Sequence, residues 1–456
     1  MNGMSPSGTP IQAEMTGGTV PGAMTACVGC HGRDGTGNSE GGVTPTSVRW
    51  RDLVRPYDVN SPSGRRHGAY DEALVQRALT VGLDSAGNRL DAVMPRFRMS
   101  NADMADLIAW LKHIGEAMDE GLSAETIAIG SLLPSLEPGT SGAAMRDALA
   151  AYFDQMNRSG GIYGRKIVFT VASSGKGQAA RLDAAKAFLD QSRPFALVAS
   201  DIAGFERDLC EVLDRREIPL IGAYTPLPVV GDPPNPEVFY LDGGLRSQAE
   251  QLARFAASRA SHGHIRMIVA PGEIYRQAAD AAAAALKDSG WTASETASGN
   301  PVLMLSPPGG PGDPLNNAAG DILLPGLLAG GGVLNSRAAR ESRLYLAYPA
   351  LPSDYNPAAS LEYAGLAESA GLPKTFVSSQ LVALASARLL MAGLTRGGRE
   401  LSRGKLIAAL ESMWEFPTGF TPPVSFNPNR RIGFTGARIV SPDPKTGGLR
   451  VVGGAR

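Results

Sequence analysis

The pattern of apolar and polar positions changes once along the chain, near residues 116–125. On the N-terminal side, the clearest element is a helix that begins after Ser100. It is predicted by an apolar stripe at helical spacing, formed by Met104, Leu107, Ile108 and Leu111. Ser100 is the residue type that caps a helix N-terminus, and Asp103 follows it three residues later. The first region is therefore expected to end in an amphipathic helix.

Beyond residue 125, short apolar runs alternate with longer amphipathic or alanine-rich stretches. The runs predict strands at residues 126–134, 166–173, 195–200, 218–223, 238–242, 265–270, 302–306 and 343–348. The stretches between them predict helices, the clearest at residues 141–159, 178–192 and 275–290. Strands that alternate with helices indicate parallel, doubly wound α/β sheets, in which ligands bind at the carboxyl ends of the strands.

Length and composition are those of a globular protein with more than one domain. The chain has 456 residues, which is too long for a single hydrophobic core. Hydrophobic residues make up 43% and charged residues 19%, which are ordinary proportions. The formal net charge of −1 provides no basic field for nucleic acid or an anionic membrane. No apolar run reaches the roughly 18 residues that suggest a transmembrane segment, so we expect none.

The pentapeptide Cys-Val-Gly-Cys-His at residues 27–31 uses two of the three cysteines. As a redox pair it lacks a neighbouring βαβ pattern, and as a zinc site it lacks a second pair of ligands, because His67 and His113 stand alone. The same spacing is the attachment motif of c-type haem, in which both thiols add to the vinyl groups and the histidine becomes an axial iron ligand. The remaining Cys210 falls in a predicted amphipathic helix and is expected to be a small buried hydrophobe.

A second axial ligand is available in the loop ahead of the terminal helix. Met94 precedes Pro95, which blocks a helix and favours an extended loop. A loop methionine in this place can reach the distal face of the iron. Met99 lies on the same loop and competes with it, as do Met104 and Met118 further along the chain. Met104 falls on the apolar stripe and is expected to belong to the core.

Residues 22–118 resemble a class I cytochrome c. The resemblance rests on CVGCHGRDGTGNSEGG near the start and MPRFRMSNADMADLIAWLKHIG at the end. It implies an all-α domain with one covalent haem c, attached through Cys27 and Cys30. It also implies His31 and Met94 as the two axial ligands of the haem iron. With both axial positions filled, electron transfer is favoured over oxygen or peroxide chemistry, so a haem enzyme such as a peroxidase is a weaker interpretation.

The haem motif also indicates the compartment. The first 24 residues are rich in Gly, Pro and Ser and contain no cationic segment followed by an apolar run, so no signal peptide is visible. In bacteria, haem is joined to cysteine thiols outside the cytoplasm. We therefore expect a mature periplasmic chain whose signal peptide has been removed. Residues 1–21 are expected to be a flexible segment, and residues 119–125 a linker.

The region after the linker contains no G-x-G-x-x-G turn, P-loop, G-x-S-x-G or H-E-x-x-H motif, so we expect no catalytic site there. Residues 126–456 resemble a type I periplasmic solute-binding protein of the branched-chain amino-acid (Leu/Ile/Val) class. The resemblance rests on the linked segments 129–190, 195–226 and 418–440. It implies two α/β lobes with doubly wound parallel sheets, joined by three crossovers, which close on a small solute. One lobe would combine residues 126–241 with 352–425, and the other 242–351 with 426–456.

The resemblance also implies ligand-contacting residues in the loops at the strand ends. These are Leu133, Pro134, Ser135, Ser200, Asp201, Ile202, Tyr224, Thr225, Asp242, Gly243, Ile274 and Tyr275. Hydroxyls and backbone amides in such loops suit a small polar group. Two departures weaken an amino-acid assignment. Asp201 stands where a neutral residue would suit a carboxylate, and residues 306–332 are Pro/Gly-rich where relatives have a regular strand–helix unit.

Together these features favour a periplasmic protein that carries single electrons on one haem. The solute-binding-like domain would act as a ligand sensor or docking module for a small-molecule solute. The expected redox partner is a periplasmic dehydrogenase or another cytochrome, because a transport protein has no need of a covalent haem. The alternative is an ABC-transporter substrate-binding protein that works with a permease and carries an accessory cytochrome domain.

Overall fold

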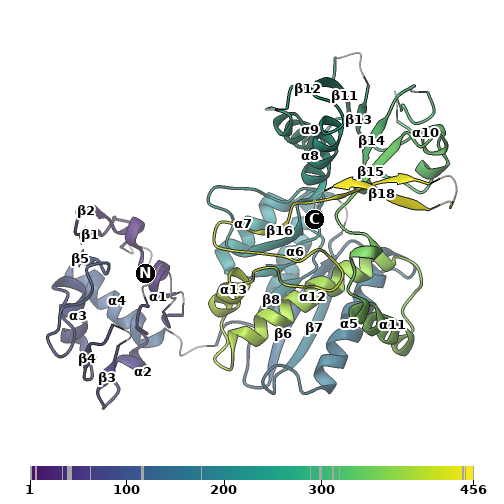
Figure 1. Ribbon diagram of the computed structural model, residues 1–456. Helices are drawn as coiled ribbons and strands as arrows, with labels where there is room; N and C mark the ends of the chain where they lie inside the picture. Colours follow the sequence, from purple (N-terminus) through teal and green to yellow (C-terminus); the bar gives the residue numbers. More distant parts are fainter. Residues whose placement is uncertain are drawn as a thin grey trace. The chain divides into compact units, whose positions relative to one another are not determined.

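The structure is a computed structural model, and it divides the chain into two compact units, Met1–Asp119 and Glu120–Arg456. Each unit is described by itself (Figure 1). The structure describes residues 3–5, 8–32, 34–37, 44–61, 63–114, 118–175, 177–287, 289–296, 300–310, 313–317, 319–443, 446 and 448–454.

The first unit combines short helices with small antiparallel strands. Its helices are η1 (Gly22–Thr25), α1 (Cys27–His31), α2 (Trp50–Leu53), α3 (Glu72–Thr80) and α4 (Asn101–His113). Its strands are β1 (Gln12–Met15), β2 (Gly18–Pro21), β3 (Val59–Asn60), β4 (Arg66–His67) and β5 (Arg96–Arg98). The predicted terminal helix is confirmed as α4. The Ser100 hydroxyl accepts a hydrogen bond from the Asp103 amide, and the Asp103 carboxylate accepts one from the Ser100 amide, a reciprocal cap that satisfies two otherwise unpaired donors.

The prediction of a flexible segment at residues 1–21 is wrong for its second half. β1 pairs with β2 on one side and with β5 on the other, in the order β2-β1-β5. Ala13 of β1 is fully buried and packs in the core of the unit with Phe97 of β5 and the apolar stripe of α4. β2 pairs with the neighbouring β1, while β1 also pairs with β5, some 80 positions away in the sequence, which no local pattern reveals.

The second unit contains two sheets (Figure 1). The first has the strand order β16-β10-β9-β8-β6-β7 and is parallel, as predicted. Its strands are β6 (Thr126–Leu133), β7 (Lys166–Ser173), β8 (Ala196–Val198), β9 (Leu220–Ile221), β10 (Val238–Asp242) and β16 (Ile432–Phe434). Its helices are α5 (Ser141–Arg158), α6 (Gln178–Ser192), α7 (Glu206–Arg216), α11 (Pro357–Ala370), α12 (Val377–Gly397) and α13 (Arg403–Glu411).

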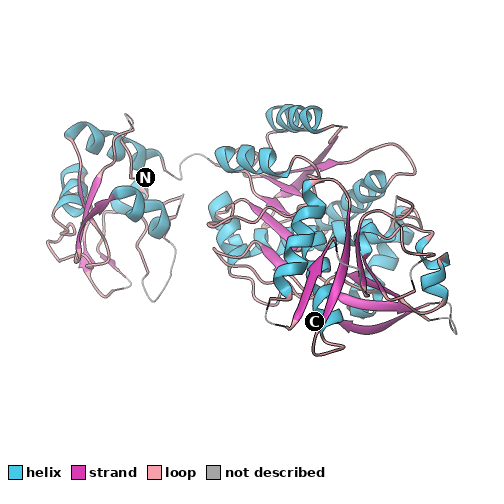
Figure 2. Ribbon diagram, turned by 90° about the horizontal axis from the view of Figure 1, so that it is seen from above, coloured by secondary structure: helices cyan, strands magenta, loops and turns pink. Residues whose placement is uncertain are grey.

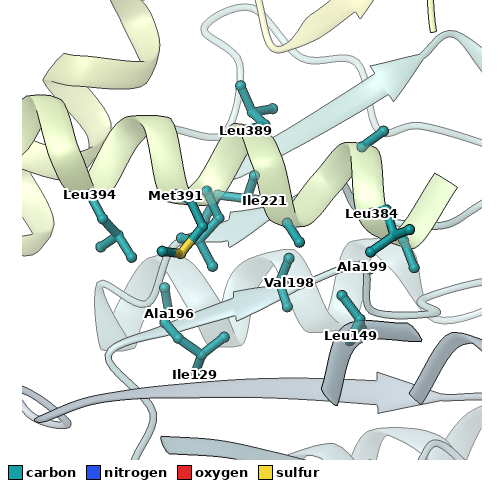
Figure 3. Packing of buried hydrophobic residues seen from close by; sticks show 14 of the residues in the cluster. Ile129, Leu149, Ala196, Val198, Ala199, Ile221, Leu384, Leu389, Met391 and Leu394 are labelled. Atoms are coloured by element: carbon teal, nitrogen blue, oxygen red, sulfur yellow. The ribbon is translucent and has the colours of Figure 1, made fainter. Parts of the chain in front are cut away.

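Helices cover both faces of this sheet, because its central strands are apolar at consecutive positions. Ala196 and Val198 of β8 pack against α5 and α12, while Leu197 between them packs on the opposite face against α6 and α7. Figure 3 shows Leu384, Met391 and Leu394 of α12 facing the strands that carry Val198 and Ile221. Figure 2 shows the helices that flank the strands of this unit. The carboxyl-end loops are therefore held on a rigid frame.

The second sheet has the order β12-β11-β13-β14-β15-β17-β18, parallel from β12 to β15 and antiparallel beyond. Its strands are β11 (Gly263–Val269), β12 (Trp291–Ser294), β13 (Val302–Leu305), β14 (Ile322–Pro325), β15 (Leu344–Tyr348), β17 (Arg438–Pro442) and β18 (Leu449–Gly454). The helical elements on it or leading out of it are α8 (Gly244–Ala257), α9 (Glu273–Ala285), η2 (Gly326–Leu328), η3 (Val333–Asn335), α10 (Arg337–Arg340) and η4 (Pro352–Asp354).

Two details of the predicted second lobe differ in the structure. Residues 426–456 do not all belong to it, because β16 pairs with β10 in the first sheet and the chain crosses only after Phe434. The Pro/Gly-rich region 306–332 also contains a regular strand, β14, which lies between β13 and β15. Among the described residues, the chain passes between the two sheets after β10, after β15 and after β16, so the three predicted crossovers are present.

α12 is the one helix of the described residues with the length and apolar composition of a membrane span. Two thirds of its apolar window, 67%, is buried inside the domain. It is apolar on most sides because it packs between the first sheet and the helices α5 and α13.

Candidate haem-attachment and solute-binding sites

The first candidate site is the helical turn α1. Residues three and four apart share one face of a helix, so Cys30 and His31 lie on the same face as Cys27. Both cysteines are free thiols, with Cys27 half-buried and Cys30 exposed. Burial raises the pKa of the Cys27 thiol. The turn therefore presents two thiols and an imidazole side by side.

The ring of His31 is oriented by the backbone. Its Nδ1 lies 2.9 Å from the carbonyl oxygen of Thr46, which can only accept, so Nδ1 carries the proton and Nε2 keeps its lone pair. Burial lowers the pKa of His31, although the Thr46 contact opposes the shift. Gly37 makes this approach of the two segments possible, because a Cβ there would lie 2.3 Å from the Pro45 carbonyl oxygen. The result is a neutral imidazole with one nitrogen available to a metal.

Met94 and the competing Met99 are both half-buried against the core that contains Cys27. Met99 also lines a cavity of about 330 Å³ beside Cys27, together with Phe97, Leu107 and Trp110. Met94 lies in the turn that leads into β5, with its amide bonded to the Asp91 carbonyl at 3.1 Å. The assignment of Met94 rather than Met99 as an axial ligand stays a prediction.

The second candidate site is the carboxyl-end edge of the first sheet in the second unit. Strands β6, β8, β9 and β10 are parallel neighbours, so the loops that follow them gather at one edge. Asp201 after β8 and Tyr224 after β9 form an isolated parallel bridge. The predicted residues Ser135, Ser200 and Thr225 follow β6, β8 and β9, and Asp242 is the last residue of β10.

Asp201 is held in a buried ion pair that the sequence did not reveal. Its carboxylate contacts the guanidinium of Arg181 on α6, accepts a hydrogen bond from Ser174 at 3.2 Å, and caps the amide of Ala203. Arg181 in turn donates to the carbonyl of Ala203 and lies over the ring of Phe205. Burial raises the pKa of Asp201, while the charge of Arg181 acts in the opposite direction. Through Ser174 and Ala203, the pair connects the loops that follow β7 and β8. The opposite charges of Arg181 and Asp201 balance each other.

Tyr224 and Asp242 are two polar side chains of this edge that make few hydrogen bonds to the rest of the domain. The side chain of Tyr224 is 38% exposed, and its pKa is raised by burial of the hydroxyl and then by the charges of Asp201 and Asp242. Asp242 accepts a hydrogen bond from the Gly244 amide at 2.8 Å. Burial raises the pKa of this carboxyl. The structure therefore brings Tyr224 close to both predicted aspartates.

Three of the remaining predicted residues use their hydroxyls in hydrogen bonds within the domain. Ser200 is fully buried, and its hydroxyl accepts from the Leu132 amide at 3.0 Å, which ties β8 to β6. The Thr225 hydroxyl donates to Glu206 at 2.6 Å. Ser135 accepts from the Glu137 amide at 3.3 Å within its loop. Tyr275 lies half-buried in the first turn of α9, at the carboxyl end of β11 in the other sheet.

Two family models match the chain. Residues 22–115 match the cytochrome c family, and residues 126–300 match the periplasmic binding protein family. The chain joins a cytochrome c domain to a domain of the periplasmic-binding-protein fold. We call these the cytochrome domain and the binding-protein domain. Comparison with curated proteins gave no match.

Solved structures support the fold of the binding-protein domain. A branched-chain amino-acid ABC transporter protein from Thermus thermophilus with bound valine is 16% identical, with a TM-score of 0.58 over 73% of this chain and 96% of that one. A fatty acid ABC transporter substrate-binding protein from Thermomonospora curvata is 15% identical, with a TM-score of 0.57 over 74% of this chain and 93% of that one. An ABC transporter substrate-binding protein from Desulfitobacterium hafniense is 16% identical, with a TM-score of 0.58 over 72% of this chain and 100% of that one. Because these names differ in solute, the likeness identifies a fold and no ligand.

The residues that sequence reasoning missed in the binding-protein domain are Arg181 and Ser174. Ser174 directly follows β7, and Arg181 lies in the first turn of α6. An arginine in the first turn of a helix is usually solvated, so its burial against Asp201 has no local signal. In the cytochrome domain, Thr46 was missed because it acts through its carbonyl, which every residue possesses.

Cys210 provides a test that separates buried from attached cysteines. It is buried between α7 and β10, 3.6 Å from the Tyr240 hydroxyl, and burial raises the pKa of its thiol to about 11. We expect the haem-loaded protein to react with no thiol reagent when native and with one equivalent when unfolded, because Cys27 and Cys30 would be thioethers. Thiol titration in urea measures this. Three equivalents in the unfolded protein would contradict attachment at both cysteines.

Proposed function

We propose that the protein is a periplasmic single-electron carrier with one covalent haem c, attached through Cys27 and Cys30 and ligated by His31 and Met94. A haem bound there supplies reversible one-electron oxidation and reduction of its iron. The binding-protein domain acts as a ligand sensor or docking module, and the redox partner is a periplasmic dehydrogenase or another cytochrome. The protein has no catalytic role of its own in this proposal.

The observation that carries the proposal is the orientation of His31. A proton held on Nδ1 by the Thr46 carbonyl leaves Nε2 to the iron, and such partners both fix the ring and make the nitrogen a better ligand. The arrangement on one helical turn, with two free thiols beside this imidazole, fits the chemistry of attachment. The half-buried thioether of Met94, just before β5, is a soft ligand for the iron. It carries no titratable proton, so the iron can be oxidised and reduced without proton transfer at this ligand.

Expression with haem-attachment machinery tests the proposal. We expect a mass increase of one haem that survives denaturation, and a low-spin spectrum in both oxidation states. We also expect the reduced protein to bind carbon monoxide weakly or not at all. A high-spin haem that binds carbon monoxide readily would overturn the His/Met assignment. Loss of the haem on denaturation would overturn covalent attachment.

For the binding-protein domain, we propose that Asp242 and Tyr224 contact the hydrogen-bond donors of a small polar solute. Arg181 and Asp201 satisfy each other, so they contribute no net charge to this edge of the sheet. The carboxylate of Asp242 and the hydroxyl of Tyr224 are acceptors with few hydrogen bonds to the rest of the domain. A solute that carries hydroxyl or ammonium groups would therefore match them.

A thermal-shift panel of branched-chain amino acids, amides, short alcohols and short fatty acids would first identify a solute. We then expect Asp242→Asn to weaken its binding by about tenfold or more, because a hydrogen bond to a charged group contributes about 1.5–3 kcal/mol. Asp280→Asn, on the exposed part of α9, is the matched control and should leave the affinity unchanged. Equal affinities for the two variants would exclude Asp242 from the solute contacts.

The second candidate function is that of an ABC-transporter substrate-binding protein with an accessory cytochrome domain. The names of the structural neighbours, which include ABC substrate-binding proteins, favour it. It predicts micromolar or tighter binding of one solute and stimulation of a partner permease. Binding without any change in the haem potential would favour transport. A potential that shifts on solute binding would favour the sensor.

A further inference from the structure

The segment that contains Met94 is closed by a side chain from the strand that follows it. Arg96 is the first residue of β5, and its guanidinium turns back over residues 90–94. It donates to the carbonyl of Met94, to that of Leu90 at 3.2 Å and to that of Asp91 at 3.3 Å. One guanidinium thus joins three carbonyls of the same turn, which its fixed fork of donors is suited to do.

The end of α3 forms the other wall of this arrangement. The Leu90 amide donates to the Gly82 carbonyl at 2.8 Å, which ties the turn to the residue just beyond α3. Gly82 has a φ of +80°, and a Cβ there would lie 1.8 Å from Nε of Arg96. The guanidinium therefore lies directly against the backbone of Gly82. A larger residue at position 82 would displace it.

β5 is itself fixed by the N-terminal strand. Glu14, Ala13 and Gln12 of β1 pair with Arg96, Phe97 and Arg98 in an antiparallel register. Ala13 and Phe97 are buried in the core of the cytochrome domain. The position of Arg96, two residues after Met94, is consequently set by a sheet and not by a free loop.

We propose that Arg96 is a positioning residue for Met94. By binding the carbonyls of residues 90, 91 and 94 against Gly82, it restricts the turn and would hold the Met94 thioether for binding to the haem iron. The pairing of β1 with β5 holds Arg96 in place for this role. The inference rests on the proposed ligation by His31 and Met94. The experiment therefore has to distinguish failure of the Arg96 role from failure of that ligation.

The experiment uses the full, haem-loaded chain and imidazole as an external ligand of the oxidised iron. Imidazole binds only when the thioether leaves, so its affinity reports how firmly Met94 is held. We expect Arg96→Gln to raise the affinity for imidazole about tenfold or more, as loss of charged hydrogen bonds implies. We expect the imidazole affinity of Arg96→Lys to lie between that of Arg96→Gln and that of the parent, because lysine keeps the positive charge but lacks the several fixed N–H donors of a guanidinium.

Arg98→Gln is the matched control. Arg98 lies on the same strand with its side chain 72% exposed and paired with Glu14, so we expect its imidazole affinity to stay within about twofold of the parent. The absorption band that arises from charge transfer between thioether sulfur and oxidised iron gives a second readout, and it should weaken in Arg96→Gln alone. Thermal unfolding of each variant checks that the domain remains folded.

Two results would overturn the inference. One leaves the proposed ligation by His31 and Met94 intact, and the other overturns that ligation as well. If Arg96→Gln binds imidazole as Arg98→Gln does while the parent shows the thioether band, Arg96 has no positioning role and the proposed ligation stands. If Met94→Ala leaves the band and the imidazole affinity of the parent unchanged, Met94 is not the ligand. The proposed ligation then fails together with the inference.

Discussion

Replacing Arg181 with alanine is expected to lower the free energy of unfolding of the binding-protein domain by about 3–5 kcal/mol. Its partner Asp201 has a side chain that is 6% exposed, and the side chain of Arg181 is 15% exposed. Removal of the guanidinium leaves a buried carboxylate with Ser174 and the Ala203 amide as partners, which do not replace a full charge. Urea-induced unfolding followed by circular dichroism measures the change.

Arg216→Ala is the matched control for this prediction. Arg216 pairs with Asp190 at 2.6 Å, but the two side chains are 35% and 66% exposed, so we expect a loss of about 1 kcal/mol or less. The double variant Arg181→Met with Asp201→Asn should recover part of the loss, since it removes both charges. Equal effects of Arg181→Ala and Arg216→Ala would show that burial of the Arg181–Asp201 pair has no energetic consequence.

Replacing Met94 with alanine is expected to lower the midpoint potential of the haem-loaded protein by on the order of 0.1 V or more, within the roughly 0.8 V that axial ligands span. A thioether stabilises the reduced iron, and its removal leaves water or an open position. We expect the reduced variant to bind carbon monoxide. Spectroelectrochemical titration gives the potential, and the carbon monoxide difference spectrum gives the open site.

Met99→Ala is the comparison that decides between the two loop methionines. Met99 is half-buried like Met94 but also lines the cavity beside Cys27, so it is the alternative that the structure makes worth testing. We expect its potential to shift much less and its spectrum to stay low-spin. The reverse pattern, with a large shift for Met99→Ala and a small one for Met94→Ala, would exchange the two assignments.

Elements with local signals could be predicted from the sequence. α4 is an example, because its capping pair and its apolar stripe lie within a dozen neighbouring residues. The parallel strands of the first sheet are another, because strands buried on both faces are apolar at consecutive positions and stand out between alanine-rich helices.

Elements whose stability comes from distant partners could not be predicted. β1 pairs with β2 across a short turn, but its place in the core depends on β5, a strand some 80 positions away in the sequence. β14 is four residues in a Pro/Gly-rich region, and it is a strand because β13 and β15 enclose it on both sides. Strand propensity depends strongly on such surroundings, so a short strand without alternation has no reliable signature.

The sequence by itself determined the chemistry available to this protein: a pair of thiols next to an imidazole, a methionine before a proline, and an α/β region without catalytic motifs. The tertiary structure alone decided how these groups are held. The tautomer of His31 depends on the Thr46 carbonyl, the charge of Asp201 is balanced by Arg181, and the Met94 turn is closed by Arg96. The first two contacts join residues 15 and 20 positions apart. The third is local in sequence, but Arg96 is held in place by the pairing of β5 with β1, more than 80 positions away. In each case the partner is set by packing, and backbone carbonyls, which every residue possesses, carry no sequence signal.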